Sequence, residues 1–245
     1  MIKFFRLLRQ RLLSEGKTGK YFKYAIGEII LVVIGILIAL QINNWNENRK
    51  DRIVEQILYK SLISSLESDL KDVNDKILIV DKALNAQNIF ITISFEKIKE
   101  RYDINQIVDL LYAVSESSRS FFPNYGLYNK ITNNNNIDLI QSNELQIKII
   151  ELYEQYYKRY NDLDLNIEQQ SLFSLNTNFF SKIQNYATDY GRYKITFEIL
   201  GKHYDQLNEE CRKINILTIL THESMIRCKN EIESLLSELR KTSNQ

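Results

Sequence analysis

YAIGEIILVVIGILIALQI, residues 24–42, is an almost uninterrupted apolar run near the start of the chain. From Ile29 to Ile42 no residue is charged, and Gln41 is the one polar side chain. A helix of this length spans roughly 28 Å, which is close to the ~30 Å thickness of the hydrocarbon layer of a bilayer. We therefore expect a single transmembrane helix at residues 24–44.

The charges on either side of this run predict its orientation. Residues 1–23 carry seven cations and one acid, whereas the charges at positions 47–52 are of mixed sign. Because basic segments are retained in the cytoplasm, residues 1–23 are expected there and residues 45–245 on the far side of the membrane. Aromatic side chains gather at membrane interfaces, and three of them flank the run: Tyr21, Tyr24 and Trp45.

Two other interpretations of the run are weaker. A cleaved signal peptide would have an unusually long basic region, and no small-x-small cleavage site follows the apolar residues. A buried core helix would not require such a charge asymmetry at its ends. The basic segment itself, MIKFFRLLRQRLL at residues 1–13, is either an amphipathic helix on the anionic inner leaflet or only a topogenic tail.

Composition limits the possible partners and secondary structure of the residues that follow the apolar run. The whole chain has a net charge of +1 and residues 1–23 contribute +6, so the remainder carries −5. This mildly acidic balance argues against nucleic acid as a partner. Helix-breaking residues are few, which favours long helices; beyond the run they are Pro123, Gly126, Gly191 and Gly201.

Three long helices are predicted from apolar residues that recur every three or four positions. The first runs from Ile53 to about Leu84 and can be continuous with the transmembrane helix. The second begins with Ser142 or Asn143 as its N-cap and ends near Asn185, and the third covers residues ~204–241. The predicted fold class is all-α: a single N-terminal transmembrane helix followed by an extracytoplasmic antiparallel bundle of long helices.

Two connections between the helices are also predicted. The segment Phe121–Gly126 is expected to be a turn that leads into a short helix at residues 125–131, because Pro123 lacks an amide donor and Gly126 can adopt a positive φ. Residues 133–136 are four asparagines, which favour a polar loop over a helix.

Two sets of side chains on the long helices are expected to be core residues. Cys211 and Cys228 would lie ~25 Å apart on one unbroken helix, far beyond the ~7 Å between Cα atoms that a disulfide allows. Tyr153, Tyr157 and Tyr160 share a helix face, and an aromatic stripe with this spacing is typical of a packed core.

No pattern in the sequence names a reaction. His203 and His222 take part in no Cys-x-x-Cys or His-x-x-x-His spacing. Nucleophile-elbow, zinc-protease and dinucleotide glycine patterns do not occur. The acid pairs Asp162/Asp164 and Glu209/Glu210 are expected on solvated helix faces. We therefore predict no catalytic residue, no cofactor, no metal site and no enzymatic activity.

Glu28 is the strongest candidate for a functional residue, because acids are rare inside membrane spans. At about 100° per residue, Glu28, Gly35 and Ala39 share one helix face, and the small-xxx-small pair lets another helix approach closely. We expect this face to associate helices within the membrane. Two alternatives are that Glu28 reaches the inner interface, where it can pair with Lys20 or Lys23, and that it relays protons.

MIKFFR at the N-terminus and LLSEGKTGKYFKYAIGEIILVVIGILIALQINNWNENRK at residues 12–50 resemble the opening of a family of single-pass membrane proteins from Bacteroidota, a family of unknown function. NIDLIQSNEL at residues 136–145 is similar to the middle of that family, which usually has a glycine-containing turn where this chain has residues 133–136. The resemblance implies an inner-membrane location with the domain in the periplasm. It implies no activity and no functional residues.

Three functions are consistent with these observations. The first is a membrane-anchored interaction or scaffolding protein whose partners are the lipid bilayer and either a second copy or another envelope protein. The second is a ligand sensor, which needs an apolar pocket with a few inward polar groups. The third is a subunit of an ion-coupled membrane complex that uses Glu28.

Overall fold

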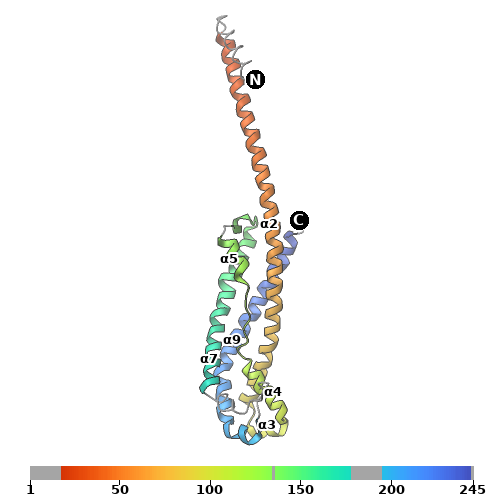
Figure 1. The fold of residues 1–245 in the computed structure, drawn as a ribbon, viewed down its shortest axis with the longest axis vertical. Coiled ribbons are helices and arrows are strands. Elements are labelled where there is room, and N and C mark those ends of the chain that lie inside the picture. The colour runs from red at the N-terminus through yellow and green to blue at the C-terminus, as the bar shows by residue number, and fades with distance from the viewer. Residues whose placement is uncertain (1–17, 134–135, 178–194, 244–245) are drawn as a thin grey trace. The chain divides into compact units, whose positions relative to one another are not determined.

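The computed structural model describes residues 18–133, 136–177 and 195–243, and every element in these ranges is helical (Figure 1). The predicted all-α class is therefore confirmed for the described part of the chain. The basic segment at residues 1–17 lies outside the described residues, as do residues 178–185 of the predicted second helix. The chain divides into two compact units, one up to Glu55 and one from Gln56 onwards.

One helix, α2 (Thr18–Thr92), contains both the apolar run and the predicted amphipathic helix that follows it. Across the described ranges it is the one helix that is long and apolar enough to cross a membrane. None of the residues in its most apolar 18-residue window is buried. A helix that is long and apolar enough to cross a membrane near the N-terminus is therefore confirmed, and the bounds 24–44 stay a prediction.

The unit that begins at Gln56 continues with shorter helices and then two long ones. In chain order, α2 is followed by α3 (Phe95–Arg101), α4 (Ile104–Ser115), α5 (Tyr125–Asn133), the 3-10 helix η1 (Asn136–Leu139), α6 (Asn143–Glu151), the π-helix η2 (Leu152–Tyr157), α7 (Lys158–Thr177) and α9 (Phe197–Ser243). Helices α7 and α9 lie side by side (Figure 1).

The N-terminal ends of these helices agree with the prediction only in part. Ser142 is the N-cap of α6, and its hydroxyl accepts a hydrogen bond from the Leu145 N–H at 3.3 Å. Helix α9 begins at Phe197, ahead of the predicted start, because the Thr196 hydroxyl accepts the Ile199 N–H at 3.3 Å. A Thr at this position is a cap signal that the apolar spacing alone does not contain.

Two predicted connections differ from the structure. The short helix expected at residues 125–131 is confirmed as α5, and the turn before it ends earlier than predicted, because Gly126 is the second residue of α5 and its φ is not positive. The Asn124 side chain accepts a hydrogen bond from the Gly126 N–H at 3.1 Å, so this free N–H in the first turn of α5 has a partner. The predicted asparagine loop is shorter than expected, since Asn133 ends α5 and Asn136 begins η1.

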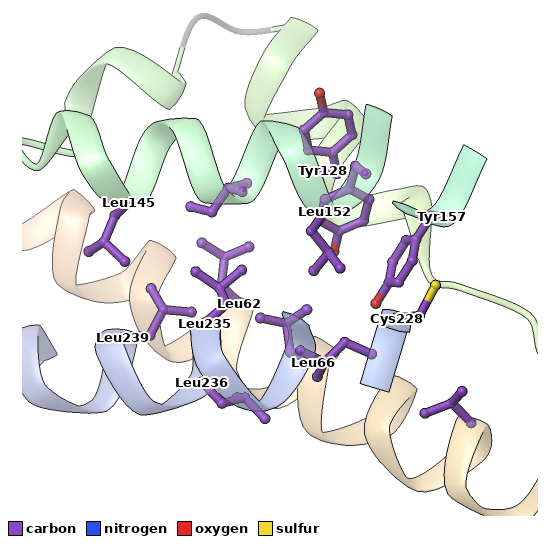
Figure 2. Close-up of a cluster of buried hydrophobic side chains, with 14 of the residues drawn as sticks. Leu62, Leu66, Tyr128, Leu145, Leu152, Tyr157, Cys228, Leu235, Leu236 and Leu239 are labelled. Carbon is purple, nitrogen blue, oxygen red and sulfur yellow. The ribbon is translucent and has the colours of Figure 1, made fainter. Parts of the chain in front are cut away.

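Two buried clusters hold this unit together. The first contains residues of α2, α5, α6, η2 and α9, and Figure 2 shows leucines of α2 and α9 facing those of α6 and η2. The second contains the end of α2 with α3, α4 and the start of α9. Cys228 belongs to the first cluster and Cys211 to the second, and neither forms a disulfide. Burial raises the pKa of both thiols to about 12, so they are inert core residues, as predicted.

A buried amide fixes α2 against α9. Gln87 is fully buried, and its Nε2 donates to the hydroxyls of Ser117 at 2.7 Å and Thr218 at 3.0 Å. Its Oε1 accepts from Asn215 Nδ2 at 2.9 Å. Since an unpaired buried amide costs stability, these bonds favour one register between the helices.

The C-terminal end of α2 is capped by side chains from α9. Asn208 Nδ2 donates to the Phe90 carbonyl at 2.7 Å, and Arg212 Nη2 donates to the Ile91 carbonyl at 3.1 Å. The Tyr204 hydroxyl donates to the Ile93 carbonyl at 2.5 Å. The last turn of α2 has no basic residue of its own, so Arg212 supplies the positive charge that a helix C-terminus favours.

Gly201 is required for the close approach of α3 to α9. A Cβ atom added there would lie 2.6 Å from the Phe95 ring. We predict that Gly201→Ala lowers the free energy of unfolding by about 1–3 kcal/mol, because the ring must be displaced from its packed position. Denaturant unfolding of the detergent-solubilised chain measures this change. In a chain that also carries Phe95→Leu, the same substitution should cost less; an equal cost in both backgrounds would contradict the explanation.

Candidate functional site

The first candidate site is the predicted association face of α2. An added Cβ at Gly35 would meet no atom within 4 Å, and Ala39 is exposed. Glu28 lies on the same side of the helix and is half-buried. The three residues therefore line an open face at which another helix can approach to backbone distance.

The predicted interfacial aromatics lie at both ends of this segment. Tyr21 and Tyr24 are in α2, but their side chains are outside those that the structure describes. Trp45 is 66% exposed, and the Arg49 guanidinium carbon lies 6.0 Å from the centre of its ring. An indole with a cation above it is chemically suited to the headgroup layer of a bilayer.

The second candidate site is a groove of about 360 Å³ between η2 and α7 on one side and α9 on the other. Its lining combines Leu163 of α7 and Leu220 of α9 with two arginines, Arg159 and Arg227. Arg227 lies 3.8 Å from the carboxylate of Glu223, which also lines the groove. The complete lining is Gln155, Tyr156, Arg159, Leu163, Leu220, Glu223, Ser224 and Arg227.

Exposed apolar residues extend this groove along α9. Ile216 is 66% exposed, and Ile219, Leu220 and Ile226 are also on the surface. Ile216 lies three residues before Ile219 and four before Leu220, which places these three on one side of α9, whereas Ile226 lies about 120° around the helix from Leu220. Apolar residues grouped in this way on a folded surface often mark a site of protein interaction.

A layer of aromatic side chains lies in the interior of the same unit. Tyr153, Tyr157 and Tyr160 are all buried, so the predicted core stripe is confirmed. The rings of Tyr128 and Tyr153 stack with centres 4.3 Å apart, and Phe121 meets Tyr157 edge-on at 5.8 Å. The first two of the three stripe tyrosines fall in the π-helix η2, a wider turn that sequence spacing did not predict.

A buried carboxylate lies at the edge of this layer. Asp69 of α2 accepts a hydrogen bond from the Tyr157 hydroxyl at 2.8 Å and from the Asn124 N–H at 3.1 Å. Burial raises the pKa of Asp69 above its usual value, and the bonds from Tyr157 and Asn124 partly oppose that rise. The neighbouring Asp72 accepts the Phe122 N–H at 3.2 Å, so two acids of α2 hold the chain that leads into α5.

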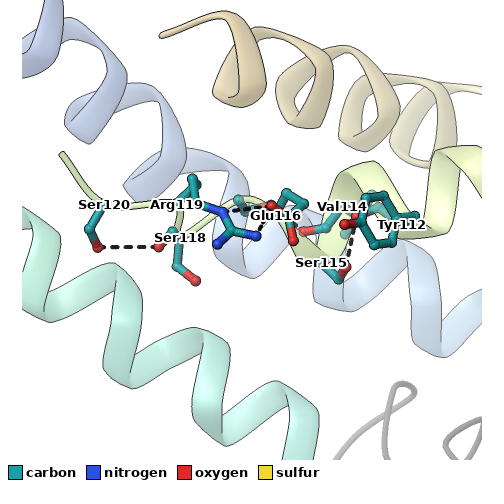
Figure 3. Close-up of polar contacts among 8 residues, drawn as sticks. Tyr112, Val114, Ser115, Glu116, Ser118, Arg119 and Ser120 are labelled. Carbon is teal, nitrogen blue, oxygen red and sulfur yellow. Dashed lines mark hydrogen bonds and ion pairs between the residues drawn. The ribbon is translucent and has the colours of Figure 1, made fainter. Parts of the chain in front are cut away.

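The connection just before this point is held by its own side chains, as Figure 3 shows. Arg119 pairs with Glu116, and the Arg119 Nε–Glu116 Oε2 distance is 2.7 Å. The Ser115 hydroxyl donates to the Tyr112 carbonyl at 2.7 Å at the end of α4. Further on, the Phe121 N–H donates to the Tyr160 hydroxyl at 2.7 Å. These contacts give the acids of α2 a fixed segment to bind.

One acid of each predicted solvent-exposed pair, Asp164 and Glu210, lies partly or fully inside the structure, so the expectation that both pairs are solvated was wrong. Asp164 is half-buried and accepts from the Tyr160 hydroxyl at 3.0 Å, and Glu210 is 5% exposed. Asp69 was not identified from the sequence as a candidate residue, although the spacing of its apolar neighbours indicates that it is buried. It falls at the apolar spacing Leu66–Asp69–Val73, which places a carboxylate on the buried face of α2.

The histidines do not assemble a metal site in the described part of the chain. Within residues 18–133, 136–177 and 195–243, no group of three or more His, Cys, Asp or Glu side chains is arranged to hold a metal ion. His222 Nε2 instead lies 2.8 Å from Asp81 Oδ1, which joins α9 to α2.

The fold and these surfaces define an all-helical protein with one helix suited to crossing a membrane. Residues 28–220 match a family of unknown function (DUF6090), and the chain belongs to that family. No curated protein and no solved structure matches the chain. The match overlaps the resemblance of residues 1–50 only from residue 28 onwards, and it confirms a family of unknown function; the bacterial group and the single-pass topology stay predictions. The matched range begins inside the apolar run and ends in α9, so both units contribute to the family.

We predict that Tyr157→Phe lowers the free energy of unfolding by about 1.5–3 kcal/mol at neutral pH, since it removes a hydrogen bond to a charged, buried carboxylate. The Tyr157 bond lowers the pKa of Asp69, so its loss raises that pKa further. The cost should therefore be smaller below the Asp69 pKa, where the carboxyl is protonated.

Denaturant unfolding at neutral and acidic pH measures both values. Tyr112→Phe is the control, because Tyr112 is 52% exposed and should respond at neither pH. An equal cost of Tyr157→Phe at the two pH values would show that the bond to Asp69 does not depend on its charge.

Proposed function

We propose that this protein is a non-enzymatic, membrane-anchored scaffold that self-associates through α2 and binds another envelope protein through its helical unit. Residues 1–23 lie in the cytoplasm, α2 crosses the inner membrane, and residues 45–245 form an antiparallel bundle in the periplasm. The proposal rests on one observation above all: no residue in the most apolar 18-residue window of α2 is buried, and lipid is the medium that can cover it.

The antiparallel arrangement of the bundle is supported by contacts between α2 and α9. Asp81 meets His222, whereas Glu67 pairs with Arg240 at 2.6 Å. The residue numbers rise in one helix as they fall in the other, which is the expected pattern for antiparallel neighbours.

Self-association within the membrane is supported by the open face at Glu28, Gly35 and Ala39. A carboxyl in a lipid environment is stabilised by a hydrogen-bond or ionic partner, and a second helix packed on this face provides such groups. The small residues give the backbone-to-backbone contact that substitutes for hydrophobic burial in lipid.

Binding of another protein is supported by the groove between α7 and α9 and the apolar residues beside it. Two leucines beside Arg159 and the Arg227–Glu223 pair suit an amphipathic helix that has an apolar stripe and charged flanks. The partner proposed for this surface is therefore a helical segment of an envelope protein. A ligand sensor is a second proposal for the same groove, whose lining places leucines beside charged and polar side chains.

The alternative function is that of a subunit in an ion-coupled complex. It is supported by Glu28, a half-buried acid within the apolar run. Glu28→Gln separates the two proposals. A scaffold keeps its partner and its self-association after this nearly isosteric change, whereas a proton carrier loses its function.

We predict that Gly35→Leu abolishes self-association, because the added side chain fills the space into which a second helix packs. Chemical crosslinking in native membranes, followed by electrophoresis, measures the dimer fraction. Gly27→Leu is a matched control: Gly27 is also open, and it lies about 80° around the helix from Gly35. If Gly27→Leu disrupts the dimer and Gly35→Leu does not, the proposed face is wrong.

We also predict that the double substitution Ile216→Glu and Leu220→Glu eliminates a protein that co-purifies with the chain from native membranes in mild detergent. Two acids placed on the apolar surface of α9 oppose docking of the apolar stripe of an amphipathic helix. Quantitative mass spectrometry compares this variant with Leu78→Glu, which alters a residue that is 61% exposed on α2. An unchanged set of co-purifying proteins in the double variant would rule out this surface.

A further inference from the structure

Three shallow hollows adjoin where α2 passes the segment that leads into α5. The first and second, of about 560 and 490 Å³, share Ser68 of α2 and Asn124. The second and the third share Phe122. Together they form one continuous surface, here called the serine groove, whose α2 wall extends from Lys60 to Lys76. A helical wall of this length measures about 24 Å.

Hydroxyl groups dominate one end of the serine groove. Four serines of α2 line it there, Ser61, Ser64, Ser65 and Ser68. The Ser65 hydroxyl lies near that of Tyr153, and in the described part of the chain both are buried without a well-formed hydrogen bond. Buried polar groups normally have a partner. Since a serine hydroxyl rotates, and both donates and accepts, Ser65 can turn towards a polar ligand in the groove.

An exposed aromatic ring lies further along the groove. Phe122 is 76% exposed, although the neighbouring Phe121 is buried. The Phe122 N–H donates to Asp72 Oδ2 at 3.2 Å, which fixes its backbone to α2. Two residues further on, the Asn124 N–H donates to Asp69 Oδ1 at 3.1 Å. A large apolar ring is therefore held on the surface between the second and third hollows.

The charges along the groove cancel. Four acids and four bases line it: Asp69, Asp72, Asp75 and Glu116 against Lys60, Lys71, Lys76 and Arg119. Lys76 lies 3.4 Å from Asp72, and Arg119 pairs with Glu116 (Figure 3). No group of three or more acids in the described ranges is arranged to hold a metal ion. A neutral ligand therefore suits the groove better than a polyanion, a polycation or a metal ion.

We propose that the serine groove binds an uncharged oligosaccharide. One sugar ring lies on the face of Phe122, because the C–H groups of a sugar carry partial positive charge and the face of an aromatic ring is negative. The hydroxyls of the neighbouring sugar rings bond to Ser65 and Ser68. Asp72 adds an acceptor, since a carboxylate keeps free lone pairs after it accepts one N–H bond. This site goes beyond the proposed function, whose partner surface lies on α7 and α9.

Titration calorimetry of the full chain tests this site, in a detergent without sugar groups. The probes are uncharged tetrasaccharides of glucose, mannose, galactose and N-acetylglucosamine. We expect saturable binding of at least one of them. Spermine and heparin are the charged comparisons. Binding of either charged compound without binding of any tetrasaccharide would overturn the inference, and so would the absence of all binding.

Substitutions at Phe122 test where the sugar binds. We expect Phe122→Ala to weaken binding of that tetrasaccharide about tenfold, because the ring supplies the stacking contact. Phe122→Tyr keeps a ring and should bind as the unmodified chain does. Leu165→Ala is the control, since Leu165 is 56% exposed on α7 and lines none of the three hollows. Equal affinities of Phe122→Ala and the unmodified chain would overturn the assignment.

A second position tests the course of the ligand along α2. Ser68→Leu fills the point where the first two hollows meet and should also weaken binding. Ser68 is exposed, so the variant should unfold at the same denaturant concentration as the unmodified chain. Ser234→Leu, at an exposed position of α9, is the matched control. Unchanged binding in Ser68→Leu would overturn the placement of the oligosaccharide along the serines.

Discussion

The surface of α2 between Ile29 and Ile42 is the constraint on which the rest of the structure depends. Every large apolar side chain in that stretch is exposed. Exposed apolar area in water costs about 25 cal/mol per Å², and soluble monomers seldom leave long continuous patches of it. A helix satisfies its own backbone hydrogen bonds, so it can place this surface in lipid without further cost to the backbone. The account of anchoring, self-association and location follows from this one property.

The unit from Gln56 onwards differs from this, because most of its large apolar residues are buried in two clusters and several of its buried polar groups are hydrogen-bonded. Gln87 bonds to Ser117, Thr218 and Asn215, and Asp69 holds the segment that enters α5. Such bonds favour a single arrangement of helices that apolar contacts alone would allow to slide. A rigid unit with an exposed apolar surface on α9 is suited to presenting that surface to a partner.

The sequence predicted the parts of the fold that depend on local periodicity and on composition. The long helices, the Ser142 cap and the buried faces of Tyr157 and Cys228 all follow from spacing or from a single capping residue. The π-helix η2 could not be predicted, because a widened turn depends on packing against other elements and leaves no spacing of its own. The positive φ expected at Gly126 was wrong for a related reason: Gly126 is already in α5, and the Asn124 side chain accepts its N–H.

The candidate sites divide in the same way. The face at Glu28, Gly35 and Ala39 lies on one helix, so its geometry follows from residue numbers. The groove with Arg159 and Arg227 joins two helices that are far apart in the chain, and Asp69 meets Tyr157 across 88 positions. Contacts of this kind depend on tertiary pairing, which periodicity does not specify. The spacing of Asp69 among buried residues was nevertheless a usable signal of a carboxylate in the core.

The central claim is that α2 crosses the inner membrane with its basic end in the cytoplasm. Protease added to intact spheroplasts tests it most directly, with an antibody against the C-terminus and a cytoplasmic protein as the control for leakage. The account predicts that the C-terminal unit is digested while the cytoplasmic control survives. A C-terminal unit that resists protease in intact spheroplasts, and is cleaved only after lysis, would contradict it.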